Sequence, residues 1–465
     1  MVKIIVLFLV VAASLLCCSP HPLSDNWPQS VPLGHDLPAY TPTLALNGQD
    51  DPAARAFKEP RAELSLREAM AAALLRNPEL ATFAWELRAA EARVLQATLL
   101  PNPGIGVEVE NIGGSGPLSG FDGAETTVSL SQGFLLGGKI RKRTHLASLE
   151  RELSGFDYET KRIEVLTQVT KRFVDVLAAQ GHVELAEETR NLAQEVLDIV
   201  ITRIEAGDVS PVEKSRSSVV VSTSRLALVR ARRELNRSRI ELAATWSSTA
   251  PEFQAVTGPF EMLQELPPAE TLARFVSRNP EVARWAVEMS RRHAAVQLAR
   301  TGAVPDVEVE AGVRHFNDVD DTAFVVGLSL PLPLFDRNQG GVLEARVNVK
   351  KAEQERRAAE VRVRSALSVN YEELAATYAE ATSLTRDVLP AARSSFEATR
   401  EAFTQGKLGY LDVLDAQRTL IDIQSQQIDA IASYHRALAD VEQLIGQPIA
   451  TVTIDETSEP RGPTQ

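Results

Sequence analysis

The stretch Arg76-Asn77-Pro78-Glu79-Leu80 decides how the chain is organised, because it returns about 200 residues later as Arg278-Asn279-Pro280-Glu281-Val282. Further stretches return at the same distance and in the same order. This spacing is much longer than the roughly 20–50 residues of a solenoid repeat. The chain therefore consists of two copies of one structural unit. The other pairs are Pro101-Asn102 with Pro305-Asp306, Val107–Glu110 with Val307–Glu310, Val128–Ser131 with Val326–Ser329, and Glu205–Asp208 with Thr404–Lys407.

Each copy has the same predicted order: a helix (66–99 in the first copy), two strands, a very long helix, a glycine turn and a returning helix. At 1.5 Å per residue, a helix of about 65 residues is roughly 100 Å long. The predicted parts are a signal peptide at 1–18, an extended arm at 19–62, repeat 1 at 63–250 (strands in 104–133, helices 140–205 and 212–246), an inter-repeat belt segment at 251–268, repeat 2 at 269–446 (strands in 306–332, helices 342–404 and 410–445) and a tail at 447–465.

The returning helix of the second copy carries a coiled-coil seam. Apolar residues recur there at seven-residue steps, which is the spacing that packs one helix along another. Only Gly155, Gly181 and Pro390 interrupt the two very long helices. Helices alone would fit a soluble coiled-coil rod equally well. The seam residues are Leu414, Ile421, Ile428, Ile431, Leu438 and Ile445.

Apolar and polar residues alternate along all four predicted strands, as in Ile105 to Glu110 and Val307 to Arg314. Alternation over about ten residues is typical of outer-membrane strands, and also of a sandwich with one wet face. The export signal and the long helices favour the membrane. Four strands cannot close a barrel, and lipid tolerates no open edge. Three protomers would give 4 × 3 = 12 strands, so we predict an α+β membrane fold: a trimeric barrel continued by a helical coiled-coil tunnel.

The N-terminus predicts export and a lipid anchor. Lys3 precedes the apolar run Ile4–Leu16, which is too short to span a bilayer comfortably. The run ends at Cys17 and Cys18, and Cys18 is the better candidate for lipidation, with Cys17 as the other. These two cysteines are the only ones, which excludes disulfides, zinc-thiolate sites and cysteine nucleophiles from the rest of the chain. The net charge of −13 argues against a nucleic-acid partner.

These features resemble the TolC-type outer-membrane efflux ducts from about Ser65 to Gly446. The shared motifs are the duplicated order, the Pro-Asn and Pro-Asp strand entries, Gly137-Gly138-Lys139 and the Asp-Val-Leu-Asp-Ala motif of 412–416. Within the family, 129–139 and 328–340 look most like the subgroup that serves heavy-metal cation pumps. The resemblance implies a passive homotrimer in the outer membrane that works with a periplasmic adaptor and an inner-membrane RND pump. Multidrug efflux, type I protein secretion and a non-conducting periplasmic coiled coil are the alternatives.

Asp412 and Asp415 form the strongest candidate site, a gate or selectivity ring. Their i, i+3 spacing places both carboxylates on one helix face near its N-terminus, where anions are favourable. A trimer would turn each residue into a ring of three that passes cations. The two positions also match the aspartate ring of the family. The alternative is ordinary helix N-terminal charge, and the first copy has Glu213 and Arg216 instead.

Two further groups of residues carry functional hypotheses. Glu108, Glu110, Glu308 and Glu310 would line the lumen and concentrate cations, although a generic polar lining explains them as well. The resemblance implies that the tips at Gly207, Asp208, Gly406 and Lys407 dock the adaptor. No catalytic constellation and no metal-ligand spacing is found. The stretch 133–139 has the spacing of a phosphate-binding loop, but Ile140 stands where such a loop needs Ser or Thr. We therefore predict no enzyme activity and no cofactor beyond the covalent lipid.

Overall fold

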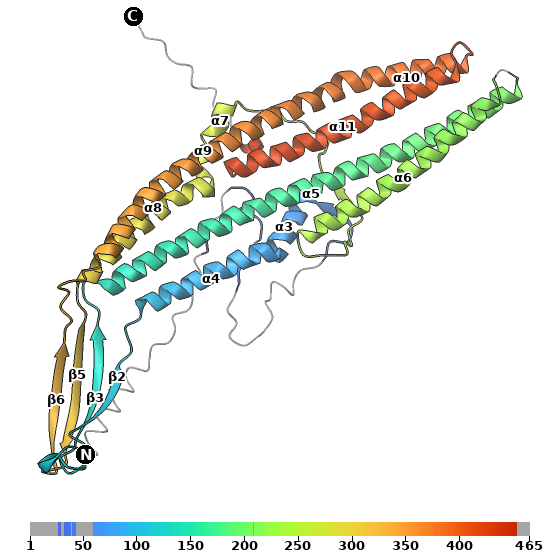
Figure 1. The fold of residues 1–465 in the computed structure, drawn as a ribbon. Coiled ribbons are helices and arrows are strands. Elements are labelled where there is room, and N and C mark those ends of the chain that lie inside the picture. Colours follow the sequence, from blue (N-terminus) through green and yellow to red (C-terminus); the bar gives the residue numbers. More distant parts are fainter. Residues whose placement is uncertain (1–26, 29–31, 39, 43–58, 208, 453–465) are drawn as a thin grey trace, which may run out of the picture. The chain divides into compact units, whose positions relative to one another are not determined.

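The computed structural model describes residues 27–28, 32–38, 40–42, 59–207 and 209–452 (Figure 1). The predicted signal peptide with Cys17 and Cys18, the tip residue Asp208 and most of the predicted arm and tail lie outside these residues. The described chain forms two compact units. The strand unit holds the described residues 27–28 together with Leu87–Arg151 and Thr301–Arg337. The helical unit holds the described residues of Gln29–Glu86, Glu152–Arg300 and Asn338–Gln465.

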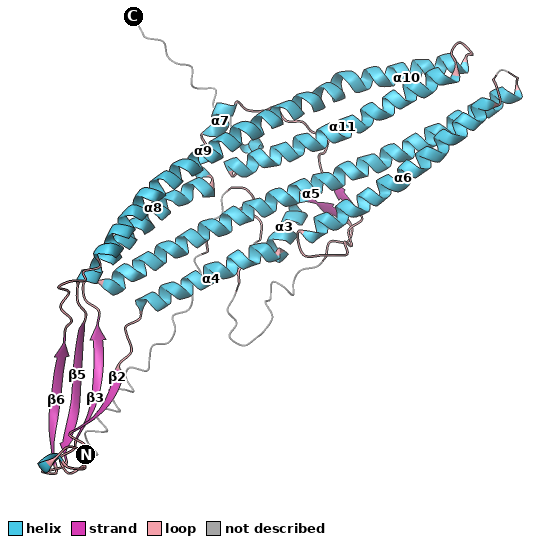
Figure 2. Cartoon of the chain, viewed as in Figure 1, coloured by secondary structure: helices cyan, strands magenta, loops and turns pink. Residues whose placement is uncertain are grey.

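The strand unit contains one antiparallel sheet in the order β2-β3-β5-β6 (Figure 2). The strands come from the predicted spans in both repeats, and strand β3 of repeat 1 pairs directly with strand β5 of repeat 2. Strands β2 and β6 are the two edges of this sheet. The sheet therefore joins the two copies side by side and leaves one edge from each copy. The bounds are β2 Gly104–Glu110, β3 Glu125–Phe134, β5 Val307–Phe316 and β6 Asp321–Ser329.

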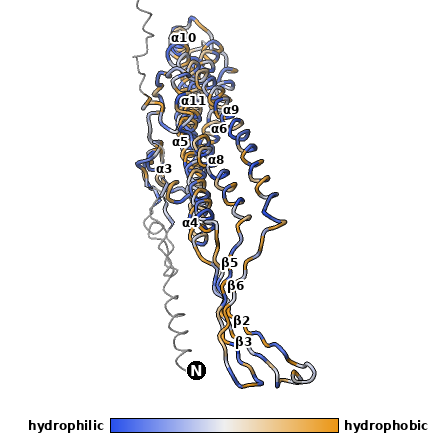
Figure 3. Tube along the Cα trace, turned by 90° about the vertical axis from the view of Figure 1, so that its left-hand side faces the viewer, coloured by the Kyte–Doolittle hydropathy of each residue, from blue (hydrophilic) through white to orange (hydrophobic). Residues whose placement is uncertain are grey.

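One face of this sheet is apolar and exposed. Register places Val107 opposite Val128, and Val128 opposite Val313, so the apolar residues of neighbouring strands share this face. Ile105 and Val326 are each 80% exposed, and Phe324 is 77% exposed. Orange and blue segments along the strands show the mixture of apolar and polar residues (Figure 3). A contiguous exposed apolar surface on a paired sheet indicates contact with lipid.

Long helices build the helical unit, and α4 and α5 continue from one unit into the other. Helix α5 has 67 residues without a break, so it is roughly 100 Å long. A short parallel pair joins β1 (Glu63–Ser65) to β4 (Ala255–Thr257). Among the described residues, no helix combines the length and the apolar character that a membrane crossing needs. The helices are α3 Leu66–Arg76, α4 Pro78–Thr98, α5 Lys139–Glu205, α6 Val212–Ala244, α7 Ala269–Ala273, α8 Pro280–Ala299, α9 Gln339–Ser383, α10 Leu389–Thr404 and α11 Tyr410–Ile445.

The predicted continuous helix 66–99 is wrong, because the chain breaks between α3 and α4 at Asn77. Pro78 has no N–H to donate and disfavours helical dihedrals at the residue before it. The Asn77 side chain accepts a hydrogen bond from the Leu80 N–H at 2.9 Å and so caps the new helix. Asn279 does the same for Glu281 at 2.8 Å. The repeated Asn-Pro-Glu motif is therefore a helix start in both copies.

The long helix predicted at 342–404 is confirmed as one helical path from Gln339 to Thr404, and it contains one π-helical turn. Helix α9 ends at Ser383, a π-helical turn spans Leu384–Val388, and α10 begins at Leu389. In this turn Leu389 donates its N–H to the Leu384 carbonyl, five residues back. Pro390, which cannot donate, follows at once. The wider turn accommodates this proline within one continuous helical path.

The predicted seam of α11 packs against both long helices of the helical unit. One core cluster contains Val200 of α5 and Phe403 of α10, and Leu414 of the predicted seam packs against it. Ile431 and Ile445 are buried at 3% and 1% exposure. Ion pairs run beside this core, including Arg436 with Asp175 at 3.2 Å and Lys171 with Asp440. The coiled-coil pattern read from the second copy therefore holds the two hairpins of this unit together.

Glu442 near the end of α11 is an acid in an apolar position. Its Oε1 accepts a hydrogen bond from the Ile449 N–H at 2.8 Å, but burial raises its pKa to about 7. The unfolded chain ionises this carboxyl near its ordinary pKa of 4.5. Between these two values the folded state holds a proton that the unfolded state has lost, so this residue makes stability fall as pH rises from about 4.5 to about 7.

We predict that Glu442→Gln raises the free energy of unfolding at pH 8, by at most about 3 kcal/mol, and leaves it nearly unchanged at pH 4. Glutamine keeps the acceptor for Ile449 and carries no charge to desolvate. Thermal unfolding of the purified protein at several pH values measures the effect, and Glu372→Gln, at an exposed site of α9, is the control. Equal effects of the two substitutions at every pH would contradict the prediction.

Candidate functional site

The turn before α11 sets the positions of Asp412 and Asp415. Helix α10 ends at Thr404, and Gly406 then adopts a positive φ of 74°, which lets the chain reverse without strain. The Gly406 N–H donates to the Phe403 carbonyl at 2.9 Å. This compact turn places the first residues of α11 directly after the tip.

Asp412 and Asp415 are both exposed, but they have different local partners. The Oδ2 atom of Asp412 accepts a hydrogen bond from the Gly409 N–H at 2.8 Å, so Asp412 stabilises the start of α11. Within the described chain, the Asp415 carboxylate makes no hydrogen bond or ion pair. Helix N-terminal charge therefore accounts for Asp412, whereas it leaves Asp415 available for an ion. The predicted ring needs other protomers and stays a prediction.

The first-copy tip differs from the second. Gly207 has a positive φ of 84°, and a Cβ at this position would meet no other atom. Glu213 and Arg216 occupy the positions that correspond to the aspartates, and they pair with each other at 2.9 Å. The first copy therefore neutralises its own charge at the level where the second copy carries two acids.

Arg203 links the two tips and was missed by the sequence analysis. From the end of α5, its Nη1 donates to the Phe403 carbonyl at 3.0 Å, and its guanidinium lies 4.7 Å from the centre of the Phe403 ring. This contact joins residues 200 positions apart. No local pattern distinguishes Arg203 from the other charged residues of α5, so only the fold identifies it.

The four strand glutamates share one face of the sheet. Glu108 lies opposite Thr127, and Glu310 lies opposite Ser131 and Gly327, so all of them project away from the apolar face. A fifth acid, Glu125, lies on the same face. Arg314 binds Glu110 and Glu125 there, each at 2.9 Å. The sheet face predicted to be acidic therefore also contains one positively charged side chain, that of Arg314, held by two ion pairs.

The Gly-Gly-Lys boundary forms the junction between β3 and α5. Gly137 and Gly138 have positive φ angles of 68° and 70°. A Cβ on Gly137 would lie 3.0 Å from the Val304 side chain, which is too close for an ordinary contact. The Nζ of Lys139 donates to Asp306 at 2.7 Å. Lys139 is thus paired within the strand unit, and the two glycines serve the sharp entry into the helix.

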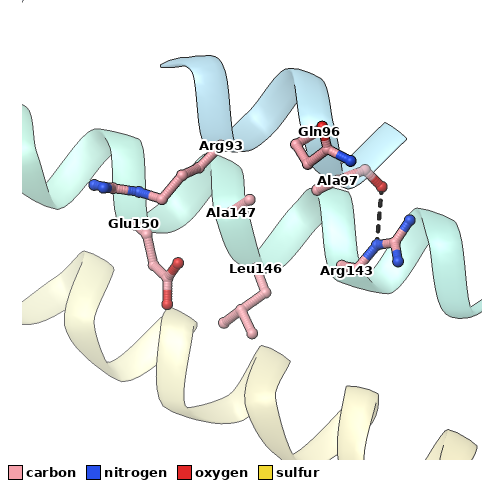
Figure 4. Close-up of a pocket in the computed structure, with 7 residues that line it drawn as sticks. All are labelled: Arg93, Gln96, Ala97, Arg143, Leu146, Ala147 and Glu150. Atoms are coloured by element: carbon pink, nitrogen blue, oxygen red, sulfur yellow. Dashed lines mark hydrogen bonds between the residues drawn. The ribbon is translucent and has the colours of Figure 1, made fainter. Parts of the chain in front are cut away.

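A pocket of about 310 Å³ lies beside this junction, between the end of α4 and the start of α5 (Figure 4). Arg143 lines it and donates from Nε to the Ala97 carbonyl at 3.1 Å and from Nη2 to the Leu99 carbonyl at 2.9 Å. Its role is to bind carbonyls at the end of α4. Within the described ranges, no three Asp, Glu, His or Cys side chains gather as metal ligands.

Residues 69–248 and 272–447 match the family described as outer membrane efflux protein, one segment in each repeat. The chain belongs to this family. Its relative CzcC, the cobalt-zinc-cadmium resistance protein of Cupriavidus metallidurans, is 30% identical over 420 residues, which cover 90% of this chain and 99% of that protein.

Solved structures confirm the predicted fold class. A membrane protein from Pseudomonas aeruginosa superposes with a TM-score of 0.70 at 17% identity, covering 89% of this chain and 97% of the other. The transmembrane channel protein CusC superposes with a TM-score of 0.68 at 16% identity, covering 88% and 99%. The chain thus has the fold of the outer-membrane efflux channels, with its two internal repeats.

We predict that Asp412→Ala lowers the free energy of unfolding by about 1 kcal/mol, because the Gly409 N–H loses its acceptor. Asp415→Ala leaves it within about 0.5 kcal/mol. Hydrogen exchange at the Gly409 amide, together with denaturant unfolding, measures this difference. Both variants should lower the ratio of cation to anion permeability in planar bilayers. Unchanged selectivity in both variants would rule out the ring.

Proposed function

We propose that this protein is the passive outer-membrane duct of a tripartite efflux system that exports heavy-metal cations. The observation that carries this proposal is the 30% identity to the cobalt-zinc-cadmium resistance protein CzcC over nearly the whole length of both chains. The duct itself performs no chemical reaction, and an inner-membrane RND pump supplies the energy. A periplasmic adaptor connects the two and docks at the tips, which contain Gly207, Asp208, Gly406 and Lys407.

The distribution of charge supports a cationic cargo. Glu108, Glu308 and Glu310 are acids on the polar face of the sheet, and Asp412 and Asp415 are exposed acids at the start of α11. Both places are acidic although they lie in different units. Acidic linings raise the local concentration of cations and hinder anions.

Two features support a homotrimer. Strands β2 and β6 end the sheet and leave backbone groups unpaired along both edges. Helix α6 also carries an exposed apolar stripe at seven-residue steps, with Val212, Val219 and Leu226 each more than half exposed. Such a stripe packs against another helix. Helix α9 carries further exposed apolar residues, namely Leu343, Val347, Val361 and Val369.

The same proposal includes a lipid anchor. The apolar run Ile4–Leu16 followed by Cys17-Cys18 supports lipidation at Cys18, or at Cys17, after export. The anchor would hold the N-terminal arm at the outer membrane. The anchor would not be needed for conduction, because the duct is formed by the strands and helices.

We predict that a strain lacking this protein becomes sensitive to cobalt, zinc and cadmium and keeps its resistance to dyes, detergents and antibiotics. Growth on graded concentrations of each compound measures this, and the wild-type gene on a plasmid should restore growth. A strain expressing Asp412→Ala/Asp415→Ala protein at the wild-type level is the matched test of the acidic ring. Sensitivity to organic compounds alone would overturn the cargo and leave the duct architecture standing.

We predict that Leu226→Asp prevents trimer formation, because the exposed apolar stripe of α6 would then bury a charge at the interface. Ala227→Asp is the control, since it places the same charge at an exposed position about 100° further round the helix. Native mass spectrometry in detergent reports the number of protomers. Trimers of normal stability in the Leu226→Asp variant would contradict the interface.

A further inference from the structure

Arg314 lies at the centre of an ion-pair cluster on the polar face of the sheet. From β5, its Nη2 binds the Glu110 carboxylate on β2 at 2.9 Å, and its Nη1 binds the Glu125 carboxylate on β3 at 2.9 Å. Its Nε donates to the Thr127 hydroxyl at 2.9 Å. All three nitrogens of the guanidinium therefore have a partner, and the cluster connects three strands.

The cluster stands where two acids face each other. Register places Glu110 directly opposite Glu125, whereas Glu108 faces Thr127, and Glu308 and Glu310 face only Gly and Ser residues. Within the described four-stranded sheet, this is the one pair of acids in direct register. Like charges in this position repel and destabilise the pairing. The one arginine of the sheet is thus placed at its one acid–acid contact.

Arg314 also occupies the oxygens that would otherwise bind a metal ion. Oε2 of Glu125 is bound to Arg314, and its Oε1 accepts a hydrogen bond from Asn111 at 2.9 Å. The Glu125 side chain is only 22% exposed, and that of Arg314 is 27% exposed. Without the arginine, two carboxylates on neighbouring strands would converge on one point. Carboxylate oxygens are ordinary ligands for divalent cations, zinc included.

A duct for metal cations needs acids that attract its cargo, but no site that holds it. Conduction requires binding strong enough for entry and weak enough for release. We propose that Arg314 is a resident counter-ion that prevents the Glu110–Glu125 pair from capturing divalent cations. This inference rests on the proposed cation duct for its biological meaning. The other acids of the same face, Glu108, Glu308 and Glu310, do not stand opposite another acid in the register of the described sheet, and they continue to attract cations.

The place of the cluster in the sheet fits this role. Glu110 ends β2, Glu125 begins β3 and Phe316 ends β5, so the cluster lies at the end of the strands away from their connections to α4 and α5. In the proposed trimer this level would contain three copies of the cluster. A captured ion here would stand at the end of the conduction path and block the ions behind it. Arg314 leaves the two carboxylates ionised, but it occupies the oxygens that a captured ion would need.

The test is the block of single-channel potassium current by zinc in planar bilayers. We expect Arg314→Met trimers to be half-blocked at a zinc concentration at least tenfold lower than the wild type. Arg314→Lys, which keeps a positive charge at this point, should stay near the wild type. The triple variant Arg314→Met/Glu110→Gln/Glu125→Gln should return to wild-type sensitivity, because it removes the acids that would capture the ion.

A merely structural role for Arg314 would lower trimer stability and leave zinc block unchanged. Heat-resistant trimers on gels therefore accompany each recording, and Arg314→Gln, which still offers a hydrogen-bond donor, provides a second uncharged variant. Equal zinc sensitivity of the wild type and both uncharged variants would overturn the proposal. So would a triple variant that remains as sensitive as Arg314→Met. Because the current is carried by potassium, these comparisons stay readable even if growth assays show that the exported compound is not a metal.

Discussion

The structure depends on a hydrogen-bonding constraint at the edges of one sheet. Strands β2 and β6 each leave a row of backbone N–H and C=O groups without a partner in the four-stranded sheet, and one face of that sheet is apolar. Water can satisfy such edges, but hydrocarbon cannot, and each unsatisfied group costs several kcal/mol there. A sheet of this kind is stable in lipid only when other copies complete it. The need for symmetry thus follows from four strands and their exposed valines, leucines and phenylalanines.

The proposed threefold symmetry would multiply every charge that the protomer presents. In the proposed trimer, an exposed carboxylate such as Asp415 would become three carboxylates at one level, and an ion-pair cluster would become three clusters. In such an assembly, an acid paired with an arginine and an acid without a cationic partner would present different charges at their levels. Glu213 is neutralised by Arg216 in the first copy, whereas the second copy presents Asp412 and Asp415 at the matching positions. The duplicated chain therefore carries two versions of its tip with different electrostatics.

Much of the fold could be predicted because its elements repeat and have strong periodicity. The glycine turns, the alternation in the strands and the seam of α11 are local patterns, and they place most elements within a few residues. The interruption at Asn77 could have been read from Pro78, since the residue before a proline avoids helical dihedrals. The π turn at Leu384–Val388 is less accessible, because a proline in a helix can produce a kink, a break or a wider turn.

The candidate sites were predictable only in part, for a physical reason. Asp412 and Asp415 are near in sequence, so their shared helix face follows from their spacing. The partners of Arg314 and Arg203 are about 190–200 residues away, and only the pairing of the two copies brings them together. The capping role of Asp412 also depends on where α11 begins, to within one residue.

The π turn gives the two copies different mechanical properties. Helix α5 keeps a regular series of backbone hydrogen bonds along its whole length, whereas its counterpart contains a wider turn followed by Pro390, which has no N–H to donate. The resistance of a helix to bending depends on an unbroken series of backbone hydrogen bonds. Under the same load, the second copy would therefore bend first, and it would do so at Leu384–Val388.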